Sequence, residues 1–164
     1  MEDEAERIEQ VFGILRDGET ELLRGLLADG LPANLQNARG DSLLMVAAYN
    51  GRHAEAALLL GHGADPMLAN PKGQLPIVGA AYQGDARMVG LLLDHGAPVD
   101  GAGTDGRTAL MTAAMFDRAP VVELLLARGA DPALRDAKGQ TALQAAEAMG
   151  ARVAPGLLRA AGQD

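Results

Sequence analysis

Residues 106–132 read GRTALMTAAMFDRAPVVELLLARGADP, a stretch that predicts two short helices and a turn. Thr108 is placed to cap the first helix, because its hydroxyl can accept a hydrogen bond from the backbone of the first turn. Asp117 is expected to end this helix, since Asp tolerates the left-handed conformation that Gly adopts freely. Pro120 suits the first turn of a second helix, and Gly129 suits the position just past its last turn.

This pattern recurs along the chain at an interval of 33 residues. A unit of this size cannot bury its apolar face alone, so successive copies must stack to form a continuous core. The sequence therefore predicts a solenoid of helix pairs in which equivalent side chains form rows. Five columns of residues share the interval: Gly30, Gly63, Gly96 and Gly129; Gly40, Gly73, Gly106 and Gly139; Gly18, Gly51, Gly84, Asp117 and Gly150; Leu26, Leu59, Leu92 and Leu125; and Ala47, Ala80, Ala113 and Ala146.

The repeated pattern G-x-T-P-L-x-x-A-A, followed by G, L-L-L and G-A-D, resembles the ankyrin repeat over about residues 17–162. The pattern stands in the chain as GDSLLMVAA (40–48), GQLPIVGAA (73–81), GRTALMTAA (106–114) and GQTALQAAE (139–147). The resemblance implies an all-α ankyrin-repeat solenoid of helix-turn-helix units joined by β-hairpin-like turns. We expect a single domain over residues 1–164, with N-terminal capping helices at 1–34, internal repeats at 35–67, 68–100 and 101–133, and a C-terminal capping repeat at 134–164.

The two ends of the chain are expected to close the stack. Apolar residues at helical spacing, separated by acidic ones, predict helices over about residues 4–16 and 19–28. At the other end, Pro155 is expected to interrupt the second helix of the last unit, and Arg159 replaces the third leucine of its triplet. We therefore expect a shortened C-terminal cap.

The motifs that suggest chemistry have structural interpretations. GAGTDG at residues 101–106 fits the dinucleotide-binding pattern GxGxxG, but a strand should precede that pattern and a helix is predicted here. We interpret this stretch as a turn between repeats. Ser42 occupies a helix-cap position rather than that of a nucleophile. His62, His95 and Arg128 fall at equivalent helix ends, where a cation offsets the helix dipole, so we expect no catalytic group, cofactor or metal.

Composition limits the classes of function. The chain has no Cys and a formal charge of −8. An acidic protein repels nucleic-acid phosphates and anionic membranes, so we expect neither as a partner. The N-terminus lacks a basic stretch followed by an apolar one, which favours a cytoplasmic protein. We expect a monomer, and the abundance of Ala, Gly, Leu and Arg favours a bacterial source.

The resemblance implies a non-catalytic module, an adaptor or inhibitor, that binds another protein through its concave face and turn tips. Tyr, Phe and Met are enriched at protein interfaces, and both tyrosines of the chain fall in one column. The candidate partner-binding residues are Val46, Gly79 and Thr112 before the last alanines of the first helices; Tyr49, Tyr82, Met115 and Phe116 after them; and Arg39, Asp41, Lys72, Gln74, Asp105 and Arg107 at the tips.

Alternatives remain open for each of these features. The aromatic rings can serve only to cover the alanine-rich helices, and the tip residues can be ordinary solvated turn residues. Gly79 lowers helix stability relative to Ala, and it is either a notch for a partner side chain or tolerated drift in an internal repeat. The rival function is an enzyme or small-ligand-binding protein with its site on the concave face.

Overall fold

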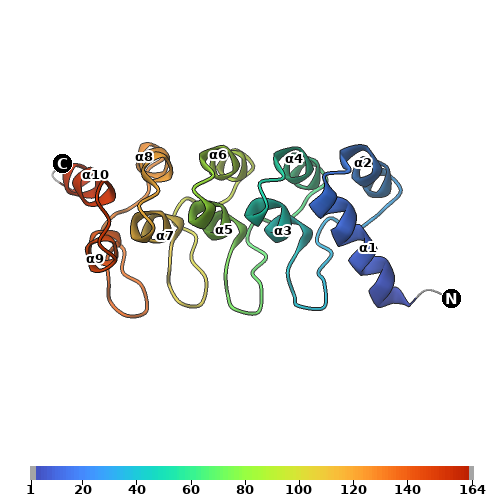
Figure 1. The fold of residues 1–164 in the computed structure, drawn as a ribbon, viewed down its shortest axis with the longest axis horizontal. Coiled ribbons are helices and arrows are strands. Elements are labelled where there is room, and N and C mark those ends of the chain that lie inside the picture. Colours follow the sequence, from blue (N-terminus) through green and yellow to red (C-terminus); the bar gives the residue numbers. More distant parts are fainter. Residues whose placement is uncertain (1–2, 163–164) are drawn as a thin grey trace.

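The computed structural model describes residues 3–162, in which ten helices follow one another as pairs. Figure 1 shows the pairs side by side in a single row, so the all-α solenoid is confirmed. No helix in this part of the chain combines the length and apolar character needed to cross a bilayer. The helices are α1 (Glu4–Asp17), α2 (Thr20–Ala28), α3 (Leu43–Tyr49), α4 (His53–Gly61), α5 (Pro76–Gln83), α6 (Ala86–Asp94), α7 (Ala109–Met115), α8 (Ala119–Ala127), α9 (Ala142–Ala148) and α10 (Ala154–Ala161).

Small side chains let the first helices of successive pairs approach closely. α3, α5, α7 and α9 contact one another in chain order, and their paired alanines, such as Ala80 and Ala81, are fully buried. An alanine presents one methyl group and loses no rotamer freedom on burial, so this row costs little side-chain entropy. Leu59, Leu92 and Leu125 are fully buried in the second helices and form a larger apolar row beside it.

The stretch at residues 101–106 lies in the loop between α6 and α7, and its interpretation as a turn is confirmed. An antiparallel bridge joins Ala102 to Thr108, and Gly106 has a φ of +69°. A Cβ on Gly103 would overlap the carbonyl oxygen of Gly73 in the preceding loop. The glycines of this motif therefore permit a tight turn and close loop packing, and a helix precedes them.

Hydroxyl caps begin most of the first helices as expected. The Ser42 hydroxyl accepts a hydrogen bond from the Met45 N–H at 3.0 Å, and the Thr108 hydroxyl accepts one from the Met111 N–H at 3.2 Å. Leu75 offers no such acceptor at the start of α5, where a proline stands in the first turn instead. The helix nevertheless forms, because its inner face is buried between α3 and α7.

Asp117 has the left-handed backbone expected of it, with a φ of +55°, and among the described residues it is the only non-glycine with positive φ. Its carboxylate accepts hydrogen bonds from the backbone N–H groups of Arg152, Val153 and Ala154 at 3.0, 3.0 and 2.8 Å. These bonds, the one from Ala154 foremost, lower the pKa of the Asp117 carboxyl from its ordinary value of 3.8. Asp117 therefore both ends one repeat and holds the start of α10 in the next.

The predicted N-terminal helices are confirmed, but the role expected of Pro155 is wrong. Pro155 lies in the first turn of α10 rather than interrupting a helix, because a helix needs no backbone donor there. The two residues before α10 are held by Asp117 instead of being helical. α10 has 8 residues where α8 has 9, so the second helix of the last unit is the shorter one, and it lacks residues at its start.

His62 and His95 lie at helix ends as expected. The Nδ1 atom of each ring is 2.9 Å from the carbonyl oxygen four residues earlier, that of Leu58 or Leu91. Arg128 occupies the equivalent position after α8 but pairs with Asp94 of the preceding repeat at 2.8 Å. The two histidines therefore contact carbonyls of their own helices, whereas Arg128 links two repeats.

Candidate functional site

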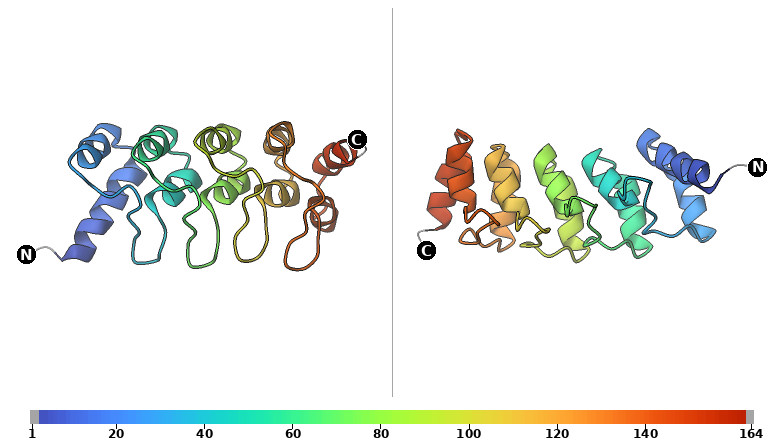
Figure 2. Two further views of the ribbon diagram at one scale, coloured as in Figure 1. Left: turned by 180° about the vertical axis from the view of Figure 1, so that it is seen from behind. Right: turned by 90° about the horizontal axis from the view of Figure 1, so that it is seen from below.

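A groove runs along the stack between the first helices and the loops that precede them. Its volume is about 600 Å³, and residues of α3, α5 and α7 line one side of it. Figures 1 and 2 show that the loops before α3, α5, α7 and α9 project to the same side. Residues of the loops before α3, α5 and α7 line the second side of the groove. We refer to this feature as the groove throughout.

The groove brings together almost all of the predicted binding residues. Met115 is half-buried and does not line it, because α7 ends there and the ring of Phe116, one residue further, takes the exposed place. The predicted residues that line the groove are Val46, Tyr49, Gly79, Tyr82, Thr112, Phe116, Arg39, Asp41, Lys72, Gln74, Asp105 and Arg107.

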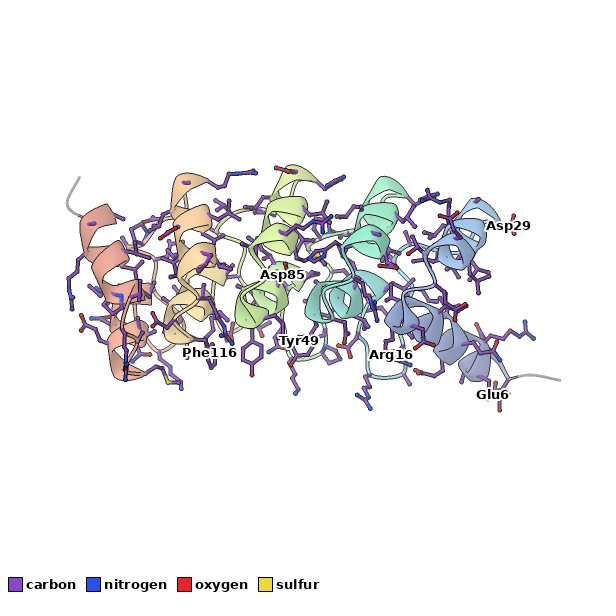
Figure 3. All side chains as sticks on the ribbon, turned by 45° about the horizontal axis from the view of Figure 1, so that its top comes forward. Glu6, Arg16, Asp29, Tyr49, Asp85 and Phe116 are labelled. Atoms are coloured by element: carbon purple, nitrogen blue, oxygen red, sulfur yellow. The ribbon has the colours of Figure 1, made fainter. Side chains whose placement is uncertain are left out.

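Three aromatic rings form a continuous row in the groove, which we call the aromatic row. Tyr49 and Tyr82 stack with ring centroids 6.1 Å apart and planes 9° from parallel, and Tyr82 meets Phe116 edge-on at 4.8 Å. The two tyrosines therefore point the same way, and Figure 3 places Tyr49 and Phe116 along one edge of the molecule. The rings remain 48%, 39% and 36% exposed, whereas Phe12, the remaining aromatic residue, is fully buried.

Gly79 lines the floor of the groove, at the position equivalent to Val46 and Thr112 of the neighbouring repeats. A Cβ added to Gly79 would lie 3.7 Å from Met45 Sδ and 3.8 Å from Tyr49 Cδ2, so the position has room for a methyl group. Thr112 is 4% exposed, and its hydroxyl has no hydrogen-bond partner among the described residues. Buried hydroxyls without a partner are rare in proteins, and this one is closed to solvent within the packed helices.

The rim of the groove carries cations that are not neutralised by neighbours. Arg39, Lys72 and Arg107 form no ion pair with any described residue, and Arg107 Nε is buried without a partner. Asp41 and Asp105 lie on the same rim, and Asp105 accepts a hydrogen bond from the Arg107 backbone N–H at 2.9 Å. The rim therefore carries both positive and negative groups.

Comparison with protein families identifies the repeated unit. A family model described as ankyrin repeats (3 copies) matches residues 13–100, 44–136 and 77–164 in overlapping registers. The chain belongs to the ankyrin repeat family. Ankyrin repeats are generally protein–protein interaction modules, and the groove described above lies on three consecutive ankyrin repeats of this chain.

A curated relative points the same way. A protein of Pseudomonas aeruginosa, named for its ankyrin repeats, is 50% identical to this chain over 54 residues. The aligned segment is 33% of this chain and 31% of that relative, so the chain matches only about a third of the relative's length. The likeness thus supports the ankyrin repeat assignment.

The sequence prediction did not include some residues of the groove, although they lie one 33-residue period away from other residues that line it. Arg16 lines the groove and precedes Tyr49 by one period, so it belongs to the column of the two tyrosines. It was overlooked because it lies in a capping helix that shares little else with the repeats. Asn37 and Asn70 also line the groove, one period apart.

Replacing Gly79 with Ala is expected to raise the free energy of unfolding by about 0.5–1 kcal/mol, because Ala favours a helix and the added methyl group fits. Urea denaturation measures the change. Gly90→Ala in α6 is the matched control and should give a similar gain, since its Cβ would likewise meet only ordinary contacts, in this case Leu124 Cδ2 at 3.8 Å. A loss of stability in the Gly79 variant alone would contradict the space that we describe there.

Proposed function

We propose that this ankyrin repeat protein is a non-catalytic module that binds one partner protein in the groove and acts as its adaptor or inhibitor. The aromatic row is the observation that carries the proposal. Its rings lie against one another and are partly exposed, so they form a continuous apolar surface with few rotatable bonds. Surfaces of this kind mark interaction sites, because they bury a large area at a low cost in side-chain entropy.

The free polar groups around the row support the same proposal. A partner that covers the rings also reaches the unpaired Arg39 and Lys72 at the rim. An apolar centre surrounded by polar groups is the usual anatomy of a protein interface. In this proposal the aromatic row supplies most of the affinity for the partner, and the polar groups around it supply the specificity.

A photo-crosslinking experiment tests the proposal. A photoreactive amino acid replaces Gln74, an exposed residue of the groove, and in a matched control it replaces Leu22, which is 48% exposed on α2. Both proteins are irradiated in cells of the source organism, and the attached proteins are identified by mass spectrometry. We expect one protein that attaches at position 74 and not at position 22, and that then binds the purified chain saturably.

The outcomes separate the two classes of function. Equal attachment from both positions would contradict the groove as the binding site. Binding that is unchanged in both Gly79→Leu and Tyr82→Ala would contradict it as well. Turnover or retention of a small molecule by the purified chain would favour the rival, an enzyme or ligand-binding protein. Gly79→Leu fills the notch between neighbouring repeats, so its effect on binding shows whether a partner side chain enters there.

A further inference from the structure

The charge of the groove differs in sign from that of the chain. Its lining contains four cationic side chains and two anionic ones, whereas the whole chain has a formal charge of −8. The positive groups are therefore concentrated here against the overall balance. The residues concerned are Arg16, Arg39, Lys72 and Arg107, with Asp41 and Asp105.

The free polar groups of the groove are mainly donors. Arg39 and Lys72 are exposed and make no ion pair or side-chain hydrogen bond with a described residue. Arg107 also lines the groove and forms no ion pair with a described residue. Because unpaired cations require anionic acceptors, the complementary ligand groups are carboxylates.

We infer that the groove binds an extended acidic segment of the partner protein, whose carboxylates face Arg39, Lys72 and Arg107 while apolar side chains lie on the aromatic row. This inference rests on the function proposed above and specifies the chemistry of the partner. Packed helices of neighbouring repeats are about 10 Å apart and an extended chain rises about 3.3 Å per residue. One repeat therefore corresponds to about three residues of the bound segment.

A protein segment fits these charges better than a nucleic acid strand. Asp41 and Asp105 stand among the rim cations, so a ligand with a uniform row of phosphates would meet repulsion at two places. A polypeptide can place neutral residues opposite those carboxylates and acidic ones opposite the cations. The negative charge of the rest of the chain further disfavours a polyanion that extends beyond the groove.

Selection from a random library tests the inference. Phage-displayed linear peptides of about twelve residues, long enough to cross three repeats at about 3.3 Å per residue, are selected on the immobilised full chain. Selected peptides are then synthesised and titrated by fluorescence anisotropy against wild type, Arg39→Gln/Lys72→Gln and the control Arg87→Gln/Lys138→Gln. The control removes the same charge from residues that do not line the groove. A labelled single-stranded oligothymidine is titrated in parallel.

We expect the selected peptides to be rich in Asp and Glu and to contain apolar residues. The groove double variant should bind them about tenfold more weakly, because it loses two ion pairs with the peptide, whereas the control variant should bind them as tightly as wild type does. Affinity should also fall as salt is added. Equal weakening by both double variants would overturn the inference, as would tighter binding of the oligothymidine or the failure of any peptide to be enriched.

The result also separates this inference from the proposed function. Neutral or basic peptides whose binding is lost in Tyr82→Ala would overturn the acidic partner while leaving a protein-binding groove in place. Acidic peptides that bind Tyr82→Ala as well as wild type would show that the rim alone holds them, which would overturn the arrangement inferred here.

Discussion

Replacing Tyr82 with Ala is expected to weaken binding of the partner protein by at least about 30-fold, the loss typical of a central interface residue. Tyr82 is the middle ring of the aromatic row and contacts both Tyr49 and Phe116. Its removal deletes its own contact area and also separates the two remaining rings. The partner protein is identified by crosslinking and purified separately, and isothermal titration with it measures the change in Kd.

Two control variants identify the cause of the expected loss. Tyr82→Phe keeps both ring contacts and should retain most of the affinity, whereas Leu22→Ala removes an exposed apolar side chain outside the groove and should retain all of it. Tyr82→Ala should lower the free energy of unfolding by about 1–3 kcal/mol, because Tyr82 makes two aromatic pairs and each contributes about 0.5–1.5 kcal/mol. An unchanged Kd in a folded Tyr82→Ala protein would remove the aromatic row from the binding site.

Replacing Asp117 with Gly is expected to loosen the C-terminal repeat, although Gly suits a positive φ better than Asp does. The loss of an acceptor for three backbone N–H groups at the start of α10 outweighs the relief of backbone strain. Hydrogen exchange should show α10 amides exchanging at least about tenfold faster, while amides of α4 keep their protection. Slower exchange of α10 would instead mean that strain at Asp117 dominates.

Acid should loosen the same repeat in the wild-type protein. The bonds from Ala154 and Arg152 lower the folded-state pKa of Asp117 below its ordinary value of 3.8. The unfolded state therefore binds the proton more readily, and the carboxylate contributes stability above that value, which is lost as the pH falls through the folded-state pKa. Asp117→Asn should lack this part of the acid response in α10 exchange. An identical acid response in both proteins would exclude Asp117 as its source.

Much of the groove could be predicted because one interval governs the whole chain. Residues 33 positions apart occupy equivalent places, so Tyr49 and Tyr82 were expected to be neighbours, and their rings do stack. The same argument placed the tip residues along one rim. It was less reliable where a helix ended, because Phe116 and not Met115 extends the aromatic row.

Contacts that depend on departures from the repeat could not be predicted. Asp117 was expected to replace Gly for its backbone conformation, but the bonds of its carboxylate to residues about one period later require the next repeat to be in place. Pro155 was expected to interrupt a helix because the sequence did not show where α10 begins, and the structure places it in the first turn of α10. Arg16 reaches the groove from a capping helix whose likeness to the repeats is weak.

The amino-acid order alone was sufficient for the helix pairs, the period, the stacking in chain order and the columns of candidate binding residues. These follow from local propensity and from apolar faces that only a neighbouring copy can bury. The groove between helices and loops, the exposure of the aromatic row, the unpaired Thr112 hydroxyl and the Asp117 cap depended on the folded molecule. Each of these depends on how neighbouring repeats lie against one another, and the distances between their atoms are set only after the repeats have packed.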